Sequence, residues 1–108
     1  MNMTLREICD ATGVSRRAVQ GYERAVLVSS SGKNRRGYLL YDTEAQERIK
    51  KIKFFQQIGF TIKEIKDIID VSNDILKVAL VNRVERLKVE KRDVEGLISK
   101  TYELIEKL

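Results

Sequence analysis

The residues best suited to chemistry in this chain are basic, and they gather between positions 16 and 36. Six arginine or lysine side chains lie in this stretch against one acidic side chain, Glu23, which gives a local charge of +5. The whole chain of 108 residues also carries a net charge of +5, so the remainder is electrically balanced. Cationic groups concentrated in this way neutralise phosphates, which indicates a protein that binds nucleic acid.

The sequence offers little material for other chemistry. It contains no histidine, which is the commonest general base and metal ligand, and it has one cysteine, Cys9. We interpret Cys9 as a small hydrophobic side chain on the buried face of a helix. We therefore expect no enzymatic activity, no metal site and no cofactor.

Length and composition favour a small, mostly helical protein. A chain of 108 residues without proline holds one modest domain plus an appendage. No apolar run approaches the roughly 20 residues that a membrane span needs, and no apolar signal segment follows Met1. We expect a cytoplasmic, nucleoid-associated protein without a membrane partner.

Signals that begin and end a helix bracket residues 4–13. Thr4 and Glu7 have the spacing of a capping box, which predicts a helix over 5–12, and Gly13 ends it. The apolar side of this helix, which we expect to be buried, comprises Leu5, Ile8 and Cys9.

A second helix follows after a tight turn. Ser15 can cap it, and Val14 and Val19 hold the positions of a hydrophobic staple. The pair forms a helix-turn-helix, and the second helix should end near Arg24. Its basic face is formed by residues spaced four apart, namely Arg16, Gln20 and Arg24.

A β-hairpin should carry the rest of the basic segment. Residues 26–28 and 38–41 are short β-prone runs on either side of a polar loop that contains glycine. The loop carries Lys33, Arg35 and Arg36 at its tip. A hairpin that follows a helix-turn-helix is a wing.

Two further helices complete the first domain. Asp42 caps a helix over 43–58 that ends at Gly59, and its inward side chains are Ala45, Ile49, Ile52 and Phe55. A second capping box, Thr61 to Glu64, with a staple of Phe60 and Ile65, begins a fourth helix that reaches about Val71. We interpret Lys50, Lys51 and Lys53 as a solvated face.

The polar break at Ser72, Asn73 and Asp74 marks the boundary of a DNA-binding domain over 1–71.

Residues 74–108 read as one long helix with an apolar seam. Its length of about 50 Å exceeds the body of so small a domain, so we expect the seam to dimerise. The alternative is that the helix folds back on its own domain. We letter the seven-residue repeat of this helix a to g, with Leu80 at position a. The seam positions a are then Leu80, Leu87, Val94, Thr101 and Leu108, and the seam positions d are Leu76, Arg83, Glu90, Leu97 and Leu104. The flanking position e includes Val84, Ile98 and Ile105. The residues predicted to dimerise are Leu76, Leu80, Leu87, Val94, Leu97 and Leu104.

The order of these elements and three local motifs resemble the MerR family of bacterial transcriptional regulators. The motifs are Gly13-Val14-Ser15-x-Arg17 with Tyr22-Glu23-Arg24, Gly37-Tyr38-x-x-Tyr41, and Gly59-Phe60-Thr61-Ile62-x-Glu64-Ile65. The likeness spans residues 3–71. It implies a mainly α fold, in which a winged helix-turn-helix domain with a two-stranded wing precedes a long antiparallel coiled-coil helix, without an appended effector domain.

The resemblance and the charge pattern together give a set of DNA-binding candidates. Tyr22 should pack its ring and present its hydroxyl at the DNA, and Tyr38 should be half core and half phosphate contact. The full set is Ser15, Arg16, Arg17, Gln20, Tyr22, Arg24, Lys33, Arg35, Arg36 and Tyr38. The chain departs from the family pattern at four positions: Gln20 replaces arginine, Gly21 replaces tyrosine, Val26 replaces glycine, and Leu39 replaces arginine.

The resulting hypothesis is a homodimeric, sequence-specific transcriptional regulator. Its partners would be double-stranded DNA, a second copy of itself and RNA polymerase, and the family acts on near-palindromic promoter operators by DNA distortion or occlusion. The sequence leaves open which effector, if any, controls the regulator. Metal-sensing relatives carry cysteines near the dimerisation helix, and the segment from Ser72 onward has none. The alternatives are an excisionase-like architectural factor that bends DNA, and a coiled-coil adaptor whose winged helix binds protein.

Overall fold

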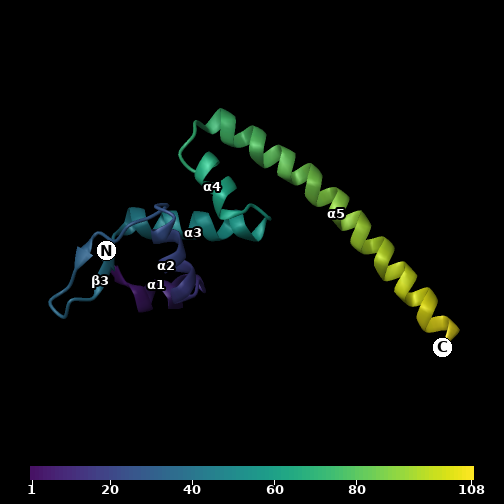
Figure 1. Cartoon of the computed structure of the whole chain (residues 1–108), viewed down its shortest axis with the longest axis horizontal. Helices are drawn as coiled ribbons and strands as arrows, with labels where there is room; N and C mark the ends of the chain where they lie inside the picture. Colours follow the sequence, from purple (N-terminus) through teal and green to yellow (C-terminus); the bar gives the residue numbers. More distant parts are fainter. The chain divides into compact units, whose positions relative to one another are not determined.

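The computed structural model describes all 108 residues, which form two compact units, Met1–Asp70 and Val71–Leu108. Figure 1 shows the elements in chain order. They are β1 (Met3–Thr4), α1 (Leu5–Thr12), α2 (Arg16–Arg24), β2 (Gly32–Lys33), β3 (Leu39–Tyr41), α3 (Thr43–Gln57), α4 (Ile62–Ile68) and α5 (Asn73–Lys107). This mainly helical fold, with a small sheet and a long C-terminal helix, confirms the predicted fold class.

Local hydrogen bonds begin the helices where the sequence predicts. The Thr4 hydroxyl accepts from Glu7 N at 3.3 Å, and Thr4 N donates to the Glu7 carboxylate at 3.0 Å, so the first capping box is complete. The Ser15 hydroxyl accepts from Ala18 N at 3.0 Å. Between these helices Gly13 has a φ of 74°, a left-handed conformation that favours glycine. The helix-turn-helix is therefore fixed by its own caps.

The segment after α2 differs from the prediction, because residues 26–28 form no strand. They close α2 instead: Leu27 N donates to the Tyr22 carbonyl and Val26 N to the Glu23 carbonyl, at 3.0 and 2.9 Å. These two bonds make a Schellman motif, and its left-handed position is occupied by Val26, with a φ of 60°. Backbone groups used to end a helix are not available for a strand, so the expected strand at 26–28 is wrong.

The wing strand lies further along the chain, in a three-stranded sheet. Strand order is β1-β3-β2, both pairs are antiparallel, and Lys33 faces Leu39 while Gly32 faces Leu40. The N-terminal strand β1 joins the other edge of β3, with Met3 opposite Tyr41. Gln46 supports this edge from α3, since its amide donates to the Met1 carbonyl at 2.6 Å and to the Tyr41 carbonyl at 2.9 Å.

The core of the first unit is built from one face of each helix. The predicted inward side of α3 is confirmed, because Ala45, Ile49, Ile52 and Phe55 are all buried. The largest fully buried side chains are Tyr41, Ile8, Ile49, Ile52, Ile65 and Val19. On α1, by contrast, only Ile8 is buried, and Leu5 and Cys9 are half-exposed, so the expectation that all three are buried is corrected.

The second capping box is also complete, with Glu64 N donating to the Thr61 hydroxyl at 3.2 Å. Phe60 packs edge-on against Phe55, with ring centroids 6.0 Å apart. Helix α4 nevertheless ends at Ile68, short of the predicted Val71. Ser72 must be extended to begin α5, with a ψ of 155°, and the chain therefore leaves helical geometry earlier.

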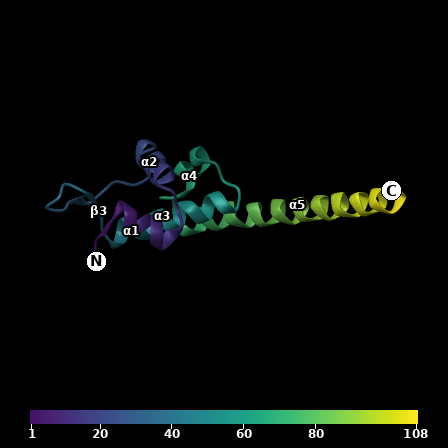
Figure 2. The ribbon, with the colours of Figure 1, turned by 90° about the horizontal axis from the view of Figure 1, so that it is seen from below.

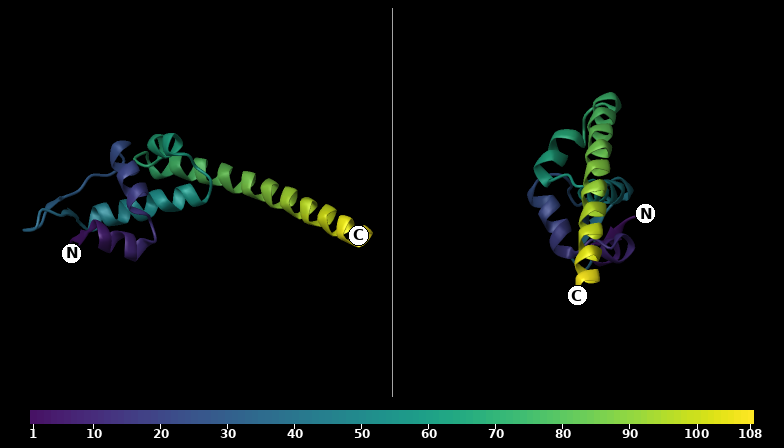
Figure 3. Two further views of the ribbon diagram at one scale, coloured as in Figure 1. Left: turned by 60° about the horizontal axis from the view of Figure 1, so that its bottom comes forward. Right: turned by 90° about the vertical axis from the view of Figure 1, so that its right-hand side faces the viewer.

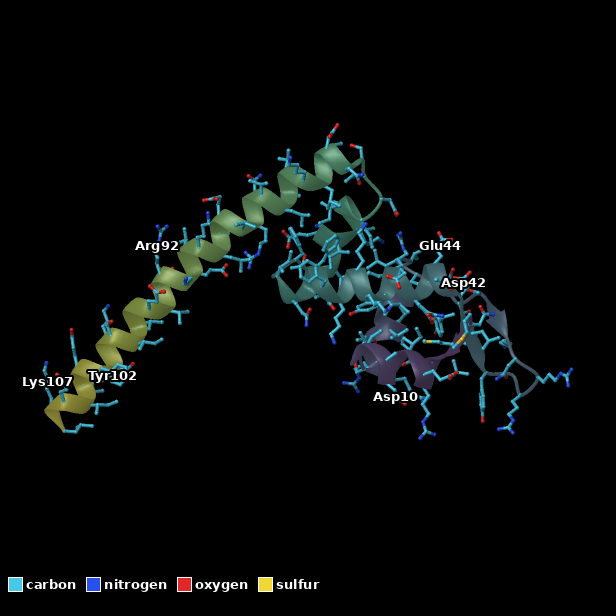
Figure 4. All side chains as sticks on the ribbon, turned by 180° about the vertical axis from the view of Figure 1, so that it is seen from behind. Asp10, Asp42, Glu44, Arg92, Tyr102 and Lys107 are labelled. Carbon is cyan, nitrogen blue, oxygen red and sulfur yellow. The ribbon has the colours of Figure 1, made fainter.

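The second unit consists of α5, a helix of 35 residues without a buried side chain. Figure 2 shows it running unbroken, and Gly96 does not interrupt it. In Figure 4, Arg92, Tyr102 and Lys107 project from this helix. None of the helices combines the length and apolar character that crossing a membrane requires.

Candidate nucleic-acid interface

The N-terminal half of α2 presents a continuous polar face. Ser15, Arg16, Arg17 and Gln20 are all exposed, and so is Arg24 in its last turn. The structure contains four ion pairs, and none of them involves an arginine of α2. These guanidinium groups are therefore free to bind an external anion.

The opposite face of α2 is fixed to the core. Val19 is fully buried, and Tyr22 is 3% exposed. The Tyr22 hydroxyl donates to the Gln56 side chain of α3 at 2.6 Å, and burial raises the pKa of this phenol. Tyr22 therefore anchors the helix, which corrects the expectation that its hydroxyl is presented to DNA.

The one acidic residue of the basic segment is held by the sheet. The Tyr41 hydroxyl donates to the Glu23 carboxylate. Burial raises the pKa of Tyr41, and the hydrogen bond and negative charge of Glu23 raise it further. Because Glu23 is engaged by Tyr41, its charge is directed away from the arginine face of α2.

The wing carries a second group of exposed basic residues. Lys33, Arg35 and Arg36 are exposed, and Tyr38 is 58% exposed, more than its expected half-buried state. Figure 3 shows the wing loop projecting beyond the helices of the first unit. A loop of this form can reach along a nucleic-acid backbone while α2 occupies a groove.

Asn34 holds the wing turn together, and the sequence analysis missed it. Its side-chain oxygen accepts from Arg36 N and Tyr38 N, each at 3.0 Å, and its own N–H donates to the Tyr38 carbonyl at 2.9 Å. Asparagine is a turn residue because its side chain bonds nearby backbone groups, so its place between two basic residues was a usable signal.

A groove in the first unit brings the two basic groups together. Arg16 from the start of α2 and Arg36 from the wing lie along the same depression, joined by Arg6 of α1, a residue that sequence reasoning did not single out. The lining residues are Thr4, Leu5, Arg6, Arg16, Asn34, Arg36, Gly37, Tyr38 and Leu39. Helix and wing therefore form one cationic surface.

The lysines of α3 are not uniformly solvated. Lys50 is exposed and pairs with Glu47 at 3.1 Å, and Lys51 lies 5.8 Å from the Phe55 ring centroid. The Lys53 ammonium donates to the Thr12 carbonyl at the end of α1. Lys53 therefore links α3 to α1, which corrects its assignment to a solvated face.

On α5 the predicted seam residues form one stripe. Leu76, Leu80 and Leu87 are half-exposed, whereas Val94, Leu97 and Leu104 are 54–62% exposed. Two shallow apolar grooves follow the stripe, one along Leu76, Leu80 and Val84 and the other along Leu97, Ile98 and Ile105. Pairing of two chains along this stripe stays a prediction.

The amino-acid sequence of this chain matches a known protein family. The family model described as "MerR HTH family regulatory protein" matches residues 3–71 of this chain. The HTH-type transcriptional activator mta of Bacillus subtilis (strain 168) is 33% identical over 98 residues, which cover 91% of this chain and 38% of mta. The chain thus spans well under half the length of that relative.

Solved structures agree with this assignment. The N-terminal part of the same Bacillus subtilis multidrug transporter activator, MtaN, is 30% identical, with a TM-score of 0.75 over 95% of this chain and 97% of that one. HiNmlR, a MerR family regulator lacking the sensor domain and bound to promoter DNA, shares the fold at 15% identity, with a TM-score of 0.74 over 92% and 80% of the two chains. Sequence and fold give the same answer: the chain belongs to the MerR family of helix-turn-helix regulatory proteins.

Proposed function

We propose that the chain is a sequence-specific, DNA-binding transcriptional regulator that acts as a homodimer. The observation that carries this proposal is the cationic surface of α2 and the wing, whose arginines have no acidic partner within the chain. Two printed descriptions support it: mta is a transcriptional activator, and HiNmlR is bound to promoter DNA.

In this proposal α2 enters the major groove. The first turn and a half of a recognition helix meets the base edges, where arginine pairs with guanine and glutamine with adenine. Arg16, Arg17 and Gln20 occupy those turns. Because the Ser15 hydroxyl is used as a cap, Ser15 would contribute its place at the helix N-terminus, where backbone N–H groups favour a phosphate.

The wing would contact the backbone beside the recognition helix. Lys33, Arg35 and Arg36 are exposed on it, and the groove that links Arg36 to Arg16 lies between wing and helix. Contacts to phosphate position a protein, whereas contacts to bases give it specificity. We assign the wing to positioning, and we assign Arg17 and Gln20 to specificity.

Residues 74–108 would dimerise two such domains, each formed by residues 1–71, through an antiparallel coiled coil. Leucines left in water cost roughly 1.5–3 kcal/mol each, which makes a partner for the exposed stripe favourable. Two domains related by two-fold symmetry read a near-palindromic operator. Bending such an operator costs about 1–6 kcal/mol. The distortion would let the dimer realign the promoter elements for RNA polymerase. Alternatively, the bound dimer would repress transcription by occluding the promoter. Such a regulator acts in the cytoplasm, at the nucleoid.

Salt-dependent binding to duplex DNA tests the proposal. Log affinity should fall linearly with log salt, by about 0.9 for each phosphate neutralised. Arg16→Ala and Arg36→Ala should each reduce the slope by about one phosphate, whereas Arg92→Ala, an exposed arginine on α5, should leave it unchanged. Binding to duplex DNA without salt dependence, or no binding at all, would favour a protein-binding adaptor.

A further inference from the structure

Arg6 stands at a place in α1 where the helix does not favour a cation. It lies in the first turn, two residues after the capping Thr4. The N-terminal end of a helix carries partial positive charge, so a basic side chain there is slightly unfavourable for the folded state. The acidic residue of the same turn, Glu7, is used in the capping box, where its carboxylate accepts from Thr4 N at 3.0 Å. The helix itself therefore gives no reason for an arginine at position 6.

The Arg6 guanidinium also has no partner within the chain. Its side chain is exposed, and it belongs to none of the four ion pairs. Asp10 lies one helical turn further along α1, at a spacing that allows an ion pair, and the two side chains do not pair. Arg48, by contrast, is held by Asp70 at 2.7 Å. Arg6 is therefore free to bind an external anion.

The sheet brings Arg6 to the wing. Thr4 of β1 pairs with Leu40 of β3, and α1 begins directly after Thr4. Arg6 consequently lies near the end of β3 at which the wing loop enters the strand, and Figures 1 and 2 both show the start of α1 beside β3. From there it lines the same groove as Arg16 of α2 and Arg36 of the wing.

The composition of this groove is one-sided in charge. Its lining contains the three arginines and no acidic residue. Leu5 and Leu39, both half-exposed, supply its apolar part, and Leu39 stands where the family pattern has arginine. Because β3 contributes no cation to the groove, the third positive charge comes from α1. The long stem of an arginine can lie along apolar surface of this kind while its guanidinium stays in water.

The position of Arg6 favours a phosphate over a base as its ligand. In helix-turn-helix proteins the second helix enters the major groove, whereas the first helix crosses the backbone. Arg6 belongs to the first helix. A guanidinium matches the geometry of phosphate oxygens with two parallel hydrogen bonds, and it keeps its charge at any physiological pH.

We propose that Arg6 binds a backbone phosphate of duplex DNA and so acts as a positioning residue for the recognition helix, supplying from α1 the cation that Leu39 does not supply from β3. The inference rests on the proposed DNA-binding function and adds to it a contact from a third element.

A salt titration of the full chain with random-sequence DNA duplexes tests the proposal. Arg6→Ala should reduce the slope of log affinity against log salt by about 0.9, so its loss of affinity should be about 3.5-fold larger at 50 mM salt than at 200 mM. Duplexes of different sequence should lose affinity by the same factor. Arg6→Lys keeps the charge and should keep the slope. Arg92→Ala, which removes an exposed arginine from α5, is the matched control and should also keep it.

Each contrary result has a distinct meaning. An unchanged slope for Arg6→Ala, or an equal reduction for Arg92→Ala, would overturn the phosphate contact, and a loss that depends on the DNA sequence would show a base contact instead. The Tm of Arg6→Ala should not fall, because alanine suits a helix and a cation leaves its N-terminal end; a lower Tm would give Arg6 a structural role and overturn the proposal. In all these cases DNA binding by the unmodified chain would stand. If the unmodified chain showed no salt-dependent binding, the proposed function would fail together with this inference.

Discussion

The left-handed residue at the end of α2 allows a stabilising substitution to be predicted. Val26 has a φ of 60° and its side chain is 82% exposed. The left-handed conformation costs an ordinary residue about 1–2 kcal/mol, whereas glycine adopts it without strain. Because Val26 buries almost nothing, Val26→Gly gives up little packing.

The net effect follows from two opposing terms. Relief of strain stabilises the folded state by about 1–2 kcal/mol, and the greater freedom of glycine in the unfolded chain costs about 0.5–1 kcal/mol. We expect Val26→Gly to raise the free energy of unfolding by about 0.5–1 kcal/mol, since both Schellman hydrogen bonds come from the backbone and are kept. The corresponding increase in Tm would be a few degrees for a domain of this size.

Urea unfolding at a fixed protein concentration measures the change, since assembly would otherwise shift the midpoint. The matched control is the neighbouring Ala25→Gly, where φ is −78° and glycine relieves no strain. The control should be destabilised by about 0.5–1 kcal/mol. If Val26→Gly were destabilised as much as Ala25→Gly, the strain at position 26 would be absent and the reasoning refuted.

Four further predictions concern binding, assembly and pH. Arg17→Ala should weaken specific DNA binding by about 1–3 kcal/mol in a gel-shift titration without lowering Tm, and unchanged affinity would remove Arg17 from the interface. Leu87→Asp should give monomers in sedimentation and far weaker DNA binding, because it buries a charge in the seam; a dimer of normal strength would contradict that role. The Arg48 guanidinium holds the pKa of the Asp70 carboxyl below its ordinary value, through contacts of 2.7 and 2.8 Å. The stability that this pair adds is therefore present at neutral pH and lost as the pH falls through the lowered pKa. Asp70→Asn should have a lower free energy of unfolding than the wild type at pH 7, and the difference should close in acid. A difference that does not change with pH would refute the stabilising role of the Arg48–Asp70 pair. DNA binding should be insensitive to zinc, mercury and oxidant, and Cys9→Ser should behave alike; a response that the mutation abolishes would reveal a thiol site.

The parts of the fold that sequence predicted are those encoded locally. The caps at Thr4, Ser15, Asp42 and Thr61 each use a side chain within three residues of the backbone group that it satisfies, so spacing alone identifies them. The buried face of α3 follows equally from its helical repeat.

The parts that sequence missed depend on distant partners. Strand β1 exists because Thr4 meets Leu40, and no local pattern marks that pairing. The resemblance assigns the Tyr22 hydroxyl to DNA, whereas its acceptor in the structure, Gln56, lies 34 residues away and no local pattern marks that contact. Arg48 was overlooked for the same reason: it donates to the Leu27 carbonyl and to Asp70, and so links the end of α2 to the end of the first unit. The exposure of Arg16, Gln20 and Arg24, by contrast, follows from the helix face that their spacing of four residues gives them.

Selection of binding sites from random duplex DNA tests the central claim most directly. The full chain should enrich a near-palindromic sequence whose two half-sites are bound by α2 of two protomers, and the double variant Arg16→Ala/Arg17→Ala should enrich nothing, although it folds. Enrichment of a single half-site without symmetry would contradict the dimer, and no enrichment by the unmodified chain would contradict sequence-specific DNA binding itself.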